Sequence, residues 1–417
     1  MNDFVSRRDF LGALGASSLL PTVAAGQVFP ADSVPVTSRE LWSWMRAQLV
    51  LEPGLAWLDT AGSGPALRAV IAREFRGRER QSENLHAYEA VALGAGMTER
   101  LARIAAFAGA EPDDVALTSG TAEAVNTVAR GLDLQAGDEV LTTEHERPAA
   151  IQPWLLEARR RGIKVVQLPQ DGVPASPEAI VGRFAGAITP RTRLMAFAHV
   201  QATDSTIMPV RELCALARSN GIFSLVDGAQ GPGLLDLRIG EYGCDAYATS
   251  FHRWLNAPRG TGALILRREA RERVWPLAID PPADAQSAQA RYGSLARYHA
   301  PSLEGIAVAI EFRQVVNPAR IGARIRELAA YLRASLGALA GVEVVSPSHP
   351  SLASGIVSFR AAGRDHASLV QSLAREDRIA VAHVAHGTAF DAIRASLHAS
   401  NDHDEIERLV NALRRRL

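Results

Sequence analysis

Apolar runs alternate with stretches of helical periodicity through the middle of the chain. The runs predict strands at residues 115–118, 139–143, 164–168, 193–200, 223–227, 245–250 and 263–267. Helical patterns lie between them, at residues 122–131, 150–161 and 210–220, and Gly221 suits the end of the last one. Such strands, separated by helices, indicate an α/β fold with a mostly parallel sheet covered on both faces. Ligands of these sheets bind at the carboxyl ends of the strands.

The pattern changes at about residue 301. Long helices are predicted at residues 303–315 and 319–339, short strands at 342–345 and 356–359, and a final helix at 403–415. Asn401 or Asp402 is the expected N-cap of that last helix. Residues 301–417 therefore read as a smaller C-terminal α+β domain, which follows a large domain over residues 59–300.

The N-terminus has the order of an export signal. Arg7 and Arg8 precede an apolar stretch at residues 11–20, and small residues suited to cleavage follow at 23–25. We predict a twin-arginine signal peptide and a periplasmic or secreted protein; the alternative is an arginine pair that begins a buried amphipathic helix. The apolar stretch is too short for an ordinary membrane span, so no stable membrane insertion is expected after cleavage.

The predicted signal covers residues 1–25, which are excluded from the fold argument, and residues 26–58 form an N-terminal arm. The 417 residues carry 45 basic and 45 acidic side chains, so no overall field favours nucleic acid. Lys164 is the only lysine. The two cysteines, Cys214 and Cys244, have apolar neighbours, and we expect buried free thiols, although export would permit a disulfide.

Two short segments at predicted strand ends suggest an anion site. Residues 118–124 run from a strand into a helix through small residues, and free amides there can hold a phosphate; the alternative is a simple helix cap. Asp227 ends an apolar strand, where a carboxylate needs a partner. A protonated pyridine nitrogen would be such a partner, and capping of the next helix is the alternative.

A third segment makes the pattern specific. Residues 249–262 contain Ser250, His252, Arg253 and a tryptophan, followed by a proline and a Gly-x-Gly turn. This run resembles the Ser-x-His-Lys-Trp segment of the class V aminotransferases, enzymes that use pyridoxal phosphate (PLP), and in particular of the isopenicillin N epimerase-like subgroup. Residues 141–146 and 393–398 resemble two further segments of that family. The resemblance covers about residues 57–417.

The resemblance implies the fold type I architecture, in which a large domain with a seven-stranded, mostly parallel sheet precedes the small one. It also implies a role for each matching residue. The phosphate would be held by Thr121, the Ala122 amide, Ser250 and His252. The cofactor ring would meet His145 on its face, Asp227 at its nitrogen, and Gln201 and Gln230 at its phenolic oxygen.

The remaining implications concern substrate and partner. Arg394 matches the arginine that binds the substrate carboxylate. Ser294 resembles a residue that reaches the phosphate from a neighbouring subunit, so a homodimer is implied, and Arg297 would join the pocket from that subunit. Catalytic candidates are Arg253, His145 and Asp227, and no metal is expected.

Arg253 stands where the family has its cofactor-binding lysine. A guanidinium is a poor nucleophile and stays protonated, so it can form no covalent link to PLP and provides no general base. Lys164 begins a strand at the opposite end of the sheet and cannot replace it. Cysteine desulfuration is disfavoured too, since neither cysteine lies in the loop before Arg394.

Three functions stay open on the sequence. The protein binds PLP or pyridoxamine phosphate (PMP) noncovalently and acts on an amino acid or a related amine or keto acid, with a histidine as base. Alternatively, it is a PLP-independent enzyme whose basic pocket, with Arg253 and Arg394, takes an anionic substrate. The third reading is a catalytically inactive binding protein.

Overall fold

The computed structural model describes residues 28–30, 33–170, 172–278, 285–293, 300–386 and 390–417. The predicted export signal, Ser294 and Arg297 lie outside these residues. In the described part of the chain, no helix is both long and apolar enough to cross a membrane.

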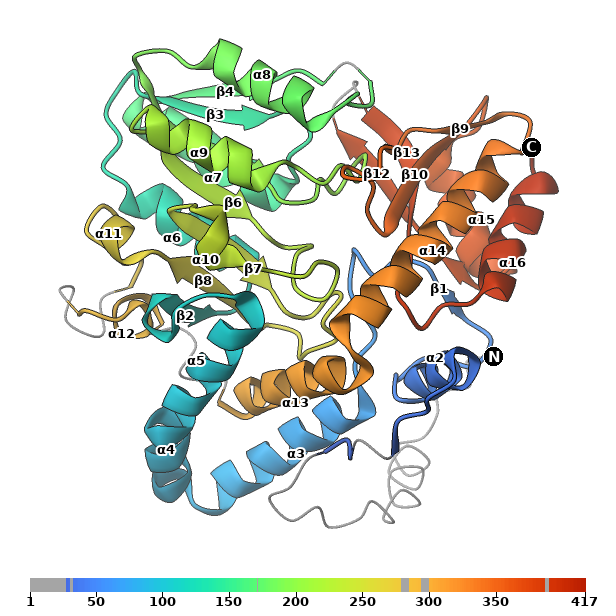
Figure 1. Cartoon of the computed structure of the whole chain (residues 1–417), viewed down its shortest axis with the longest axis horizontal. Coiled ribbons are helices and arrows are strands. Elements are labelled where there is room, and N and C mark those ends of the chain that lie inside the picture. Colours follow the sequence, from blue (N-terminus) through green and yellow to red (C-terminus); the bar gives the residue numbers. More distant parts are fainter. Residues whose placement is uncertain (1–27, 31–32, 171, 279–284, 294–299, 387–389) are drawn as a thin grey trace, which may run out of the picture.

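A seven-stranded sheet forms the centre of the large domain (Figure 1). Its strand order is β2 (Val115–Thr118), β8 (Gly262–Leu266), β7 (Ala246–Ser250), β6 (Phe223–Asp227), β5 (Thr192–Ala198), β3 (Glu139–Thr143) and β4 (Lys164–Leu168). Only β8 runs antiparallel to its neighbours. The predicted mostly parallel sheet is confirmed. The prediction was possible because strands buried on both faces carry apolar runs, which can be recognised in the sequence.

Two sets of helices cover this sheet, each with its own apolar cluster. One cluster lies under α6 (Thr121–Gly131), α7 (Pro148–Arg161), α11 (Arg268–Arg271) and α12 (Ala288–Tyr292). The other lies under α5 (Ala95–Ala108), α8 (Pro177–Ala187), α9 (Val210–Ser219) and α10 (Ile239–Tyr242). The 3-10 turn η2 (Pro112–Asp114), which has no buried residue, precedes β2. Cys214 on α9 and Cys244 before β7 are buried free thiols. A hydrogen bond with Cys214, together with burial, raises the pKa of Cys244.

The N-terminal helices extend the large domain at one end. They are α2 (Ser38–Ala47), α3 (Arg68–Glu83) and α4 (Leu85–Leu93). Helix α13 (Ala300–Val316) lies along α3 (Figure 1), and its apolar side chains belong to the core of the large domain. The two cores separate inside α14 (Pro318–Gly337), between Ile325 and Leu328, rather than before α13, where the sequence pattern changes.

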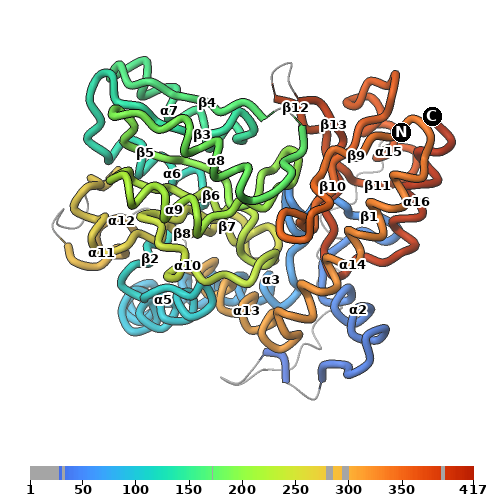
Figure 2. Tube along the Cα trace, turned by 45° about the horizontal axis from the view of Figure 1, so that its top comes forward, coloured from blue at the N-terminus to red at the C-terminus, as the bar shows by residue number. Residues whose placement is uncertain are grey.

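The small domain is built on an antiparallel sheet with the order β12 (Ala382–His386), β13 (Phe390–Ser396), β10 (Ile356–Ala361) and β9 (Val342–Val344). Helices α14, α15 (His366–Glu376) and α16 (His403–Arg414) pack with it, and Asp402 is the N-cap of α16. Strand β1 (Ala56–Trp57) pairs with β11 (Ile379–Ala380), so the chain crosses to this domain between α2 and α3. Figure 2 shows the two domains side by side.

Candidate active site

The carboxyl ends of β6 and β7 meet the amino end of α6, and a cluster of small polar side chains lies there. The Thr121 amide donates to Ser250 Oγ at 2.9 Å, and the two hydroxyl oxygens are 2.8 Å apart. A Cβ atom on Gly262 would lie 2.5 Å from Gly120 Cα, so only glycine permits this approach. The structure therefore brings together Thr121 and Ser250, which are 129 residues apart.

His252 and His145 border the same region as neutral imidazoles. Burial, and then the Arg253 charge, lower the pKa of His252 to about 4. Burial likewise lowers the pKa of His145 to about 4. The His145 ring meets the Phe390 ring edge-on at 5.2 Å, and its Nδ1 lies 3.8 Å from Asp204 Oδ2. A neutral imidazole can stack on a ring and can accept a proton.

Asp227 ends β6, as predicted, but its carboxylate already has a cationic partner. Arg147 Nε donates to Asp227 Oδ2 at 2.8 Å, and Arg147 Nη2 lies 2.7 Å from the same oxygen. The other oxygen, Oδ1, accepts the Ala229 amide at 2.9 Å. Sequence reasoning missed Arg147. One signal was available: it is the N-cap of α7, where the helix dipole disfavours a cation.

Glu146 is a second carboxyl group that the sequence did not reveal. Its Oε1 accepts the Thr143 hydroxyl at 3.0 Å and the Ala198 amide at 3.1 Å. Burial, and then the negative charge of Asp227, raise the pKa of Glu146 to about 8. Glu146 is therefore mostly protonated at pH 7, and Asp227 with Arg147 forms a nearly neutral pair beside it.

Arg253 lies close to this pair. Its Nη1 donates to the Gly62 carbonyl at 3.0 Å. Burial, and then the charges of Arg147 and Arg394, lower the pKa of Arg253 to about 10, so it stays charged at neutral pH. The loop at residues 59–65 covers its backbone: a Cβ on Gly64 would lie 1.8 Å from the Arg253 carbonyl oxygen. This contact fixes the start of the Arg253 side chain.

The small domain contributes Arg394 from β13. Its Nη2 donates to Asp59 Oδ1 at 2.8 Å, and its Nη1 donates to the Ala202 carbonyl at 3.0 Å. The predicted carboxylate-binding arginine is thus ion-paired with Asp59, which the sequence analysis did not identify. A substrate carboxylate would have to replace Asp59 or share the guanidinium with it.

The two predicted glutamines differ in the hydrogen bonds that their side-chain amides make within the protein. Gln201 is fully buried and donates to Thr143 Oγ1 and Gln170 Oε1, each at 3.2 Å. Gln230 donates to the Ala61 carbonyl at 3.0 Å and accepts Trp254 Nε1 at 2.7 Å. Gln230 therefore braces the loop around Arg253 with its oxygen and one of its two N–H groups.

Lys164 is exposed at the amino end of β4, in register with Glu139 on β3. The predicted ligand site lies at the other end of the strands, so Lys164 is not available to it. In the described part of the chain, no group of three or more His, Cys, Asp or Glu side chains could hold a metal ion.

Several buried polar atoms of this site find no hydrogen-bond partner among the described residues. They are His145 Nδ1, His252 Nδ1, Gln201 Oε1, Arg253 Nε and Arg394 Nε. Buried polar atoms nearly always have partners, and a polar ligand or bound water would satisfy these five. The residues fit a PLP-like molecule at its phosphate end. At the ring nitrogen the residues fit less well, because Asp227 offers only one free acceptor site there, the remaining lone pair of Oδ1.

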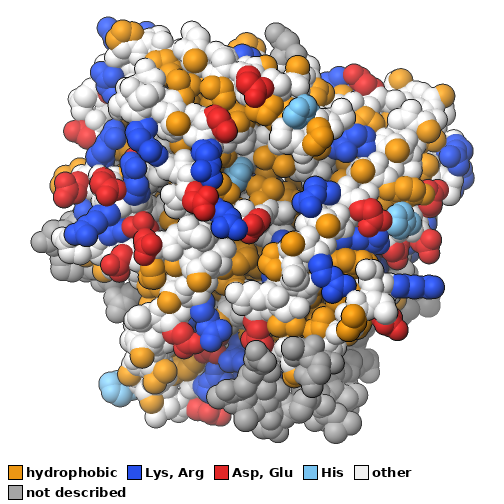
Figure 3. All heavy atoms as spheres, viewed as in Figure 1, with side chains coloured by type: hydrophobic (Ala, Val, Ile, Leu, Met, Phe, Trp, Pro, Cys, Tyr) orange, Lys and Arg blue, Asp and Glu red, His pale blue; other side chains and the backbone are white. Residues whose placement is uncertain are grey.

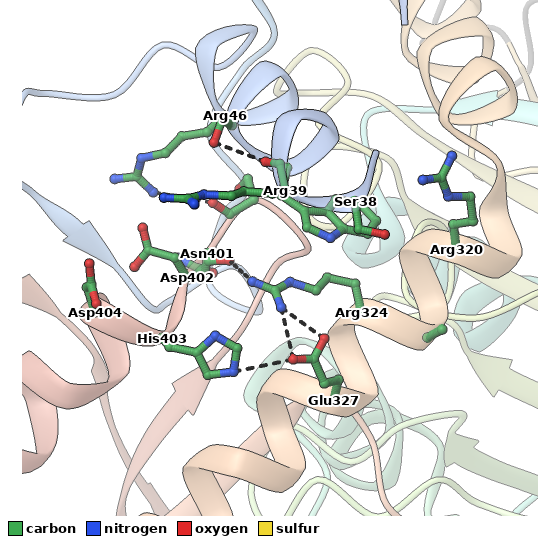
Figure 4. Close-up of a pocket in the computed structure, with 14 residues that line it drawn as sticks. Ser38, Arg39, Arg46, Arg320, Arg324, Glu327, Asn401, Asp402, His403 and Asp404 are labelled. Atoms are coloured by element: carbon green, nitrogen blue, oxygen red, sulfur yellow. Dashed lines mark hydrogen bonds and ion pairs between the residues drawn. The ribbon is translucent and has the colours of Figure 1, made fainter. Parts of the chain in front are cut away.

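A separate cavity of about 800 Å³ lies between α2, α14 and the start of α16 (Figure 4). Arg46 and Arg324 line it, but Arg46 pairs with Glu405 at 2.9 Å and Arg324 with Glu327 at 2.9 Å. It contains none of the polar side chains described above. Figure 3 shows acidic and basic side chains intermixed on the visible face, with no large basic patch.

The chain is similar in sequence to known proteins over most of its length. The family model described as aminotransferase class-V matches residues 56–409. The chain is 34% identical to the isopenicillin N epimerase of Streptomyces clavuligerus, over 89% of this chain and 97% of that protein. It is 29% identical to the cysteine desulfurase of Dickeya dadantii, over 93% and 98%.

Two solved structures share the fold. A cysteine desulfurase from Escherichia coli gives a TM-score of 0.75 at 24% identity and covers 90% of this chain and 98% of its own. A C-DES variant with glycine covalently linked to its PLP cofactor gives 0.77 at 23% identity, covering 88% and 98%.

Proposed function

This chain belongs to the aminotransferase class V family, and from that premise we propose that it acts on an amino acid, or a related amine or keto acid, with PLP or PMP held noncovalently. The observations that carry the proposal are the buried polar atoms without hydrogen-bond partners on the candidate site residues and the Thr121–Ser250 contact at the start of α6. Such atoms are costly unless a ligand or water satisfies them. The epimerase and desulfurase relatives support an enzymatic role.

The phosphate would lie at the amino end of α6, where the Thr121 hydroxyl, the Ala122 amide and the helix dipole favour an anion. Ser250 and His252 would complete its hydrogen bonds. His145 would lie on the face of the ring. When bound, the cofactor supplies an electron-accepting ring that stabilises negative charge near the substrate nitrogen.

The substrate carboxylate would bind Arg394 in exchange for Asp59. His145 Nδ1 has no partner among the described residues and can receive a proton from the substrate, because its pKa of about 4 leaves it neutral at pH 7. Arg253 cannot take this proton, since its guanidinium is already charged. Its chemical role would be to bind a carboxylate or to stabilise developing negative charge.

A second candidate function needs no PLP. The Arg147–Asp227 pair favours it, because the carboxylate that would normally serve a cofactor is engaged by a guanidinium. Arg147 and Arg394 each lie near enough to Arg253 for their charges to lower its pKa. The three arginines would hold an anionic substrate such as a dicarboxylate and stabilise its negative charge.

Native mass spectrometry of the freshly purified full chain separates these candidates. We expect an added mass equal to PLP or PMP that leaves the protein on denaturation, even after borohydride treatment. A borohydride-fixed cofactor would contradict noncovalent binding. A bound anion of another mass, or a ligand-free protein that turns over an acid, would favour the second candidate.

We also propose that the mature protein is exported folded, because the twin-arginine pattern precedes a domain able to load a cofactor. Replacing both Arg7 and Arg8 by lysine should retain the protein in the cytoplasm, as measured by cell fractionation. A matched Arg39→Lys, Arg46→Lys double variant should be exported normally. Unchanged export of the signal variant would contradict the proposal.

A homodimer is part of the same proposal. The resemblance implies that Ser294 and Arg297 reach the site of the neighbouring subunit. Analytical ultracentrifugation of the mature chain should give twice the monomer mass, and a monomer that still binds the ligand would contradict it.

A further inference from the structure

We propose that Arg147 is a positioning residue that keeps the ring nitrogen of a bound pyridoxyl ligand unprotonated, which turns the site away from reactions that need a strong electron sink. This inference rests on the proposed noncovalent binding of PLP or PMP. It concerns the protonation state of the ligand's ring nitrogen, and we infer that Arg147 and Asp227 together determine that state.

The first step is the position of Arg147. It follows β3 and begins α7, and its side chain crosses to the end of β6, 80 residues away in the sequence. Two of its nitrogens lie 2.8 and 2.7 Å from Asp227 Oδ2. The side chains of Arg147 and Asp227 are only 19% and 5% exposed, so water screens the pair weakly.

The second step is the number of acceptor sites that Asp227 retains. A carboxylate oxygen has two lone pairs. Oδ2 faces both Arg147 nitrogens, and Oδ1 accepts the Ala229 amide. A ring nitrogen can therefore approach one remaining site on Oδ1, with a full positive charge a few ångströms behind it.

The third step is the balance of charge. A protonated ring nitrogen is stabilised by an unpaired carboxylate and destabilised by a nearby cation. Arg147 neutralises Asp227, and Glu146 adds little negative charge at neutral pH, since its pKa is about 8. Arg253 adds a further cation in the same region. The deprotonated ring nitrogen is thus the favoured form.

The fourth step is the chemical consequence. An unprotonated pyridine ring withdraws electrons less strongly than a pyridinium ring. Arg253 has already removed the usual general base at the family's lysine position. Both changes weaken proton abstraction next to the substrate nitrogen, so they act in the same direction.

The test measures the ring nitrogen directly, independently of activity. PMP labelled with nitrogen-15 in the ring would be bound to the full chain, and its nitrogen chemical shift followed as a function of pH. We expect the shift of a neutral pyridine at pH 7 in the unaltered protein. In Arg147→Gln the pH at which the ring loses its proton should rise by about one to three units.

Two further variants make the test specific. Arg147→Lys restores a cation near Asp227 and should return the neutral shift, whereas a merely structural role would not require the charge. Arg259→Gln removes an exposed charge on the loop after Arg253 and should leave the nitrogen shift unchanged.

The outcomes separate this inference from the proposed function. A protonated ring nitrogen in the unaltered protein overturns the inference while noncovalent binding stands, even if Arg147→Gln fails to fold. If Arg147→Gln retains PMP and the unaltered protein does not, the inference is also overturned, because the Arg147–Asp227 pair would then prevent the ring from binding. Failure of both proteins to retain labelled PMP overturns the proposed function, and the inference with it.

Discussion

The two ends of the candidate site differ in the kind of groups that form them. At the phosphate end, Thr121 and Ser250 form a compact pair between β7 and α6. At the ring end, charged side chains predominate: Arg147 engages Asp227, and Arg253 lies close to this pair. The difference shows that one pocket can combine a cluster of small uncharged groups with a set of paired charges.

The two ends depend on different kinds of interaction. The phosphate end depends on backbone amides at a helix terminus and on close packing at Gly262, which few substitutions would preserve. The ring end depends on charged side chains, and a charge can be matched by a new counter-charge. Arg147, Asp227 and the protonated Glu146 form such a matched set.

The largest expected effect comes from Arg253→Lys, which places a primary amine at the ring end. If the phosphate end still holds PLP, the amine is presented to the bound aldehyde as an intramolecular partner, and covalent capture should rise from none to near stoichiometric. Nearby Arg147 and Arg394 should lower the pKa of the new amine and favour its reactive form. Borohydride reduction followed by peptide mass analysis checks this result.

Arg259→Lys is the matched control for that experiment, because it places an amine on the same loop at an exposed position. It should give no stoichiometric adduct. If folded Arg253→Lys forms no reducible adduct at saturating PLP, the pocket is not a PLP site, and the second candidate function or a catalytically inactive protein must replace the first.

The second largest expected effect is a pH dependence of stability that comes from Glu146 at the ring end. Its pKa is about 8 in the folded chain and near 4.5 when unfolded, so the folded state holds the proton more tightly. Its contribution to stability is therefore complete below pH 4.5 and is lost as the pH rises towards and past 8. At pH 9 the loss is on the order of a few kcal/mol.

Glu146→Gln should remove this dependence, since the amide does not titrate. Denaturant unfolding between pH 5 and 9 should show the variant gaining stability relative to the unaltered protein as the pH rises. Glu99→Gln, at a side chain that is 64% exposed, should show no such trend. Parallel pH profiles for Glu146→Gln and the unaltered chain would contradict the burial of a protonated Glu146.

The smallest expected effect comes from a substitution at the phosphate end. Thr121→Val removes a hydroxyl that lies 2.8 Å from Ser250 Oγ, and it should weaken PMP binding about five- to tenfold, equivalent to roughly 1–1.5 kcal/mol. Calorimetric titration would measure it. Thr127→Val alters the same helix, where the hydroxyl donates to the Glu123 carbonyl, and should leave the affinity unchanged. Equal losses in both variants would indicate damage to α6 rather than lost ligand contact.

Strands of the large sheet were predictable because most of them contain an apolar run of consecutive residues. The sequence analysis predicted no element at two places where burial depends on a distant partner. Helix α3 buries only Val70 and Gly77 among its own residues, and its place is set by packing against α13. Strand β12 alternates between half-buried and exposed residues, so its apolar signal is faint.

The sequence by itself determined the α/β sheet, the family and the absence of a lysine at position 253, because these follow from local pattern and ordered motifs. Tertiary structure alone decided the partners of the charged groups. Arg147 reaches Asp227 across 80 residues and Arg394 reaches Asp59 across 335. An ion pair leaves no periodic trace in the sequence, because it depends on which strand and helix ends the fold brings together.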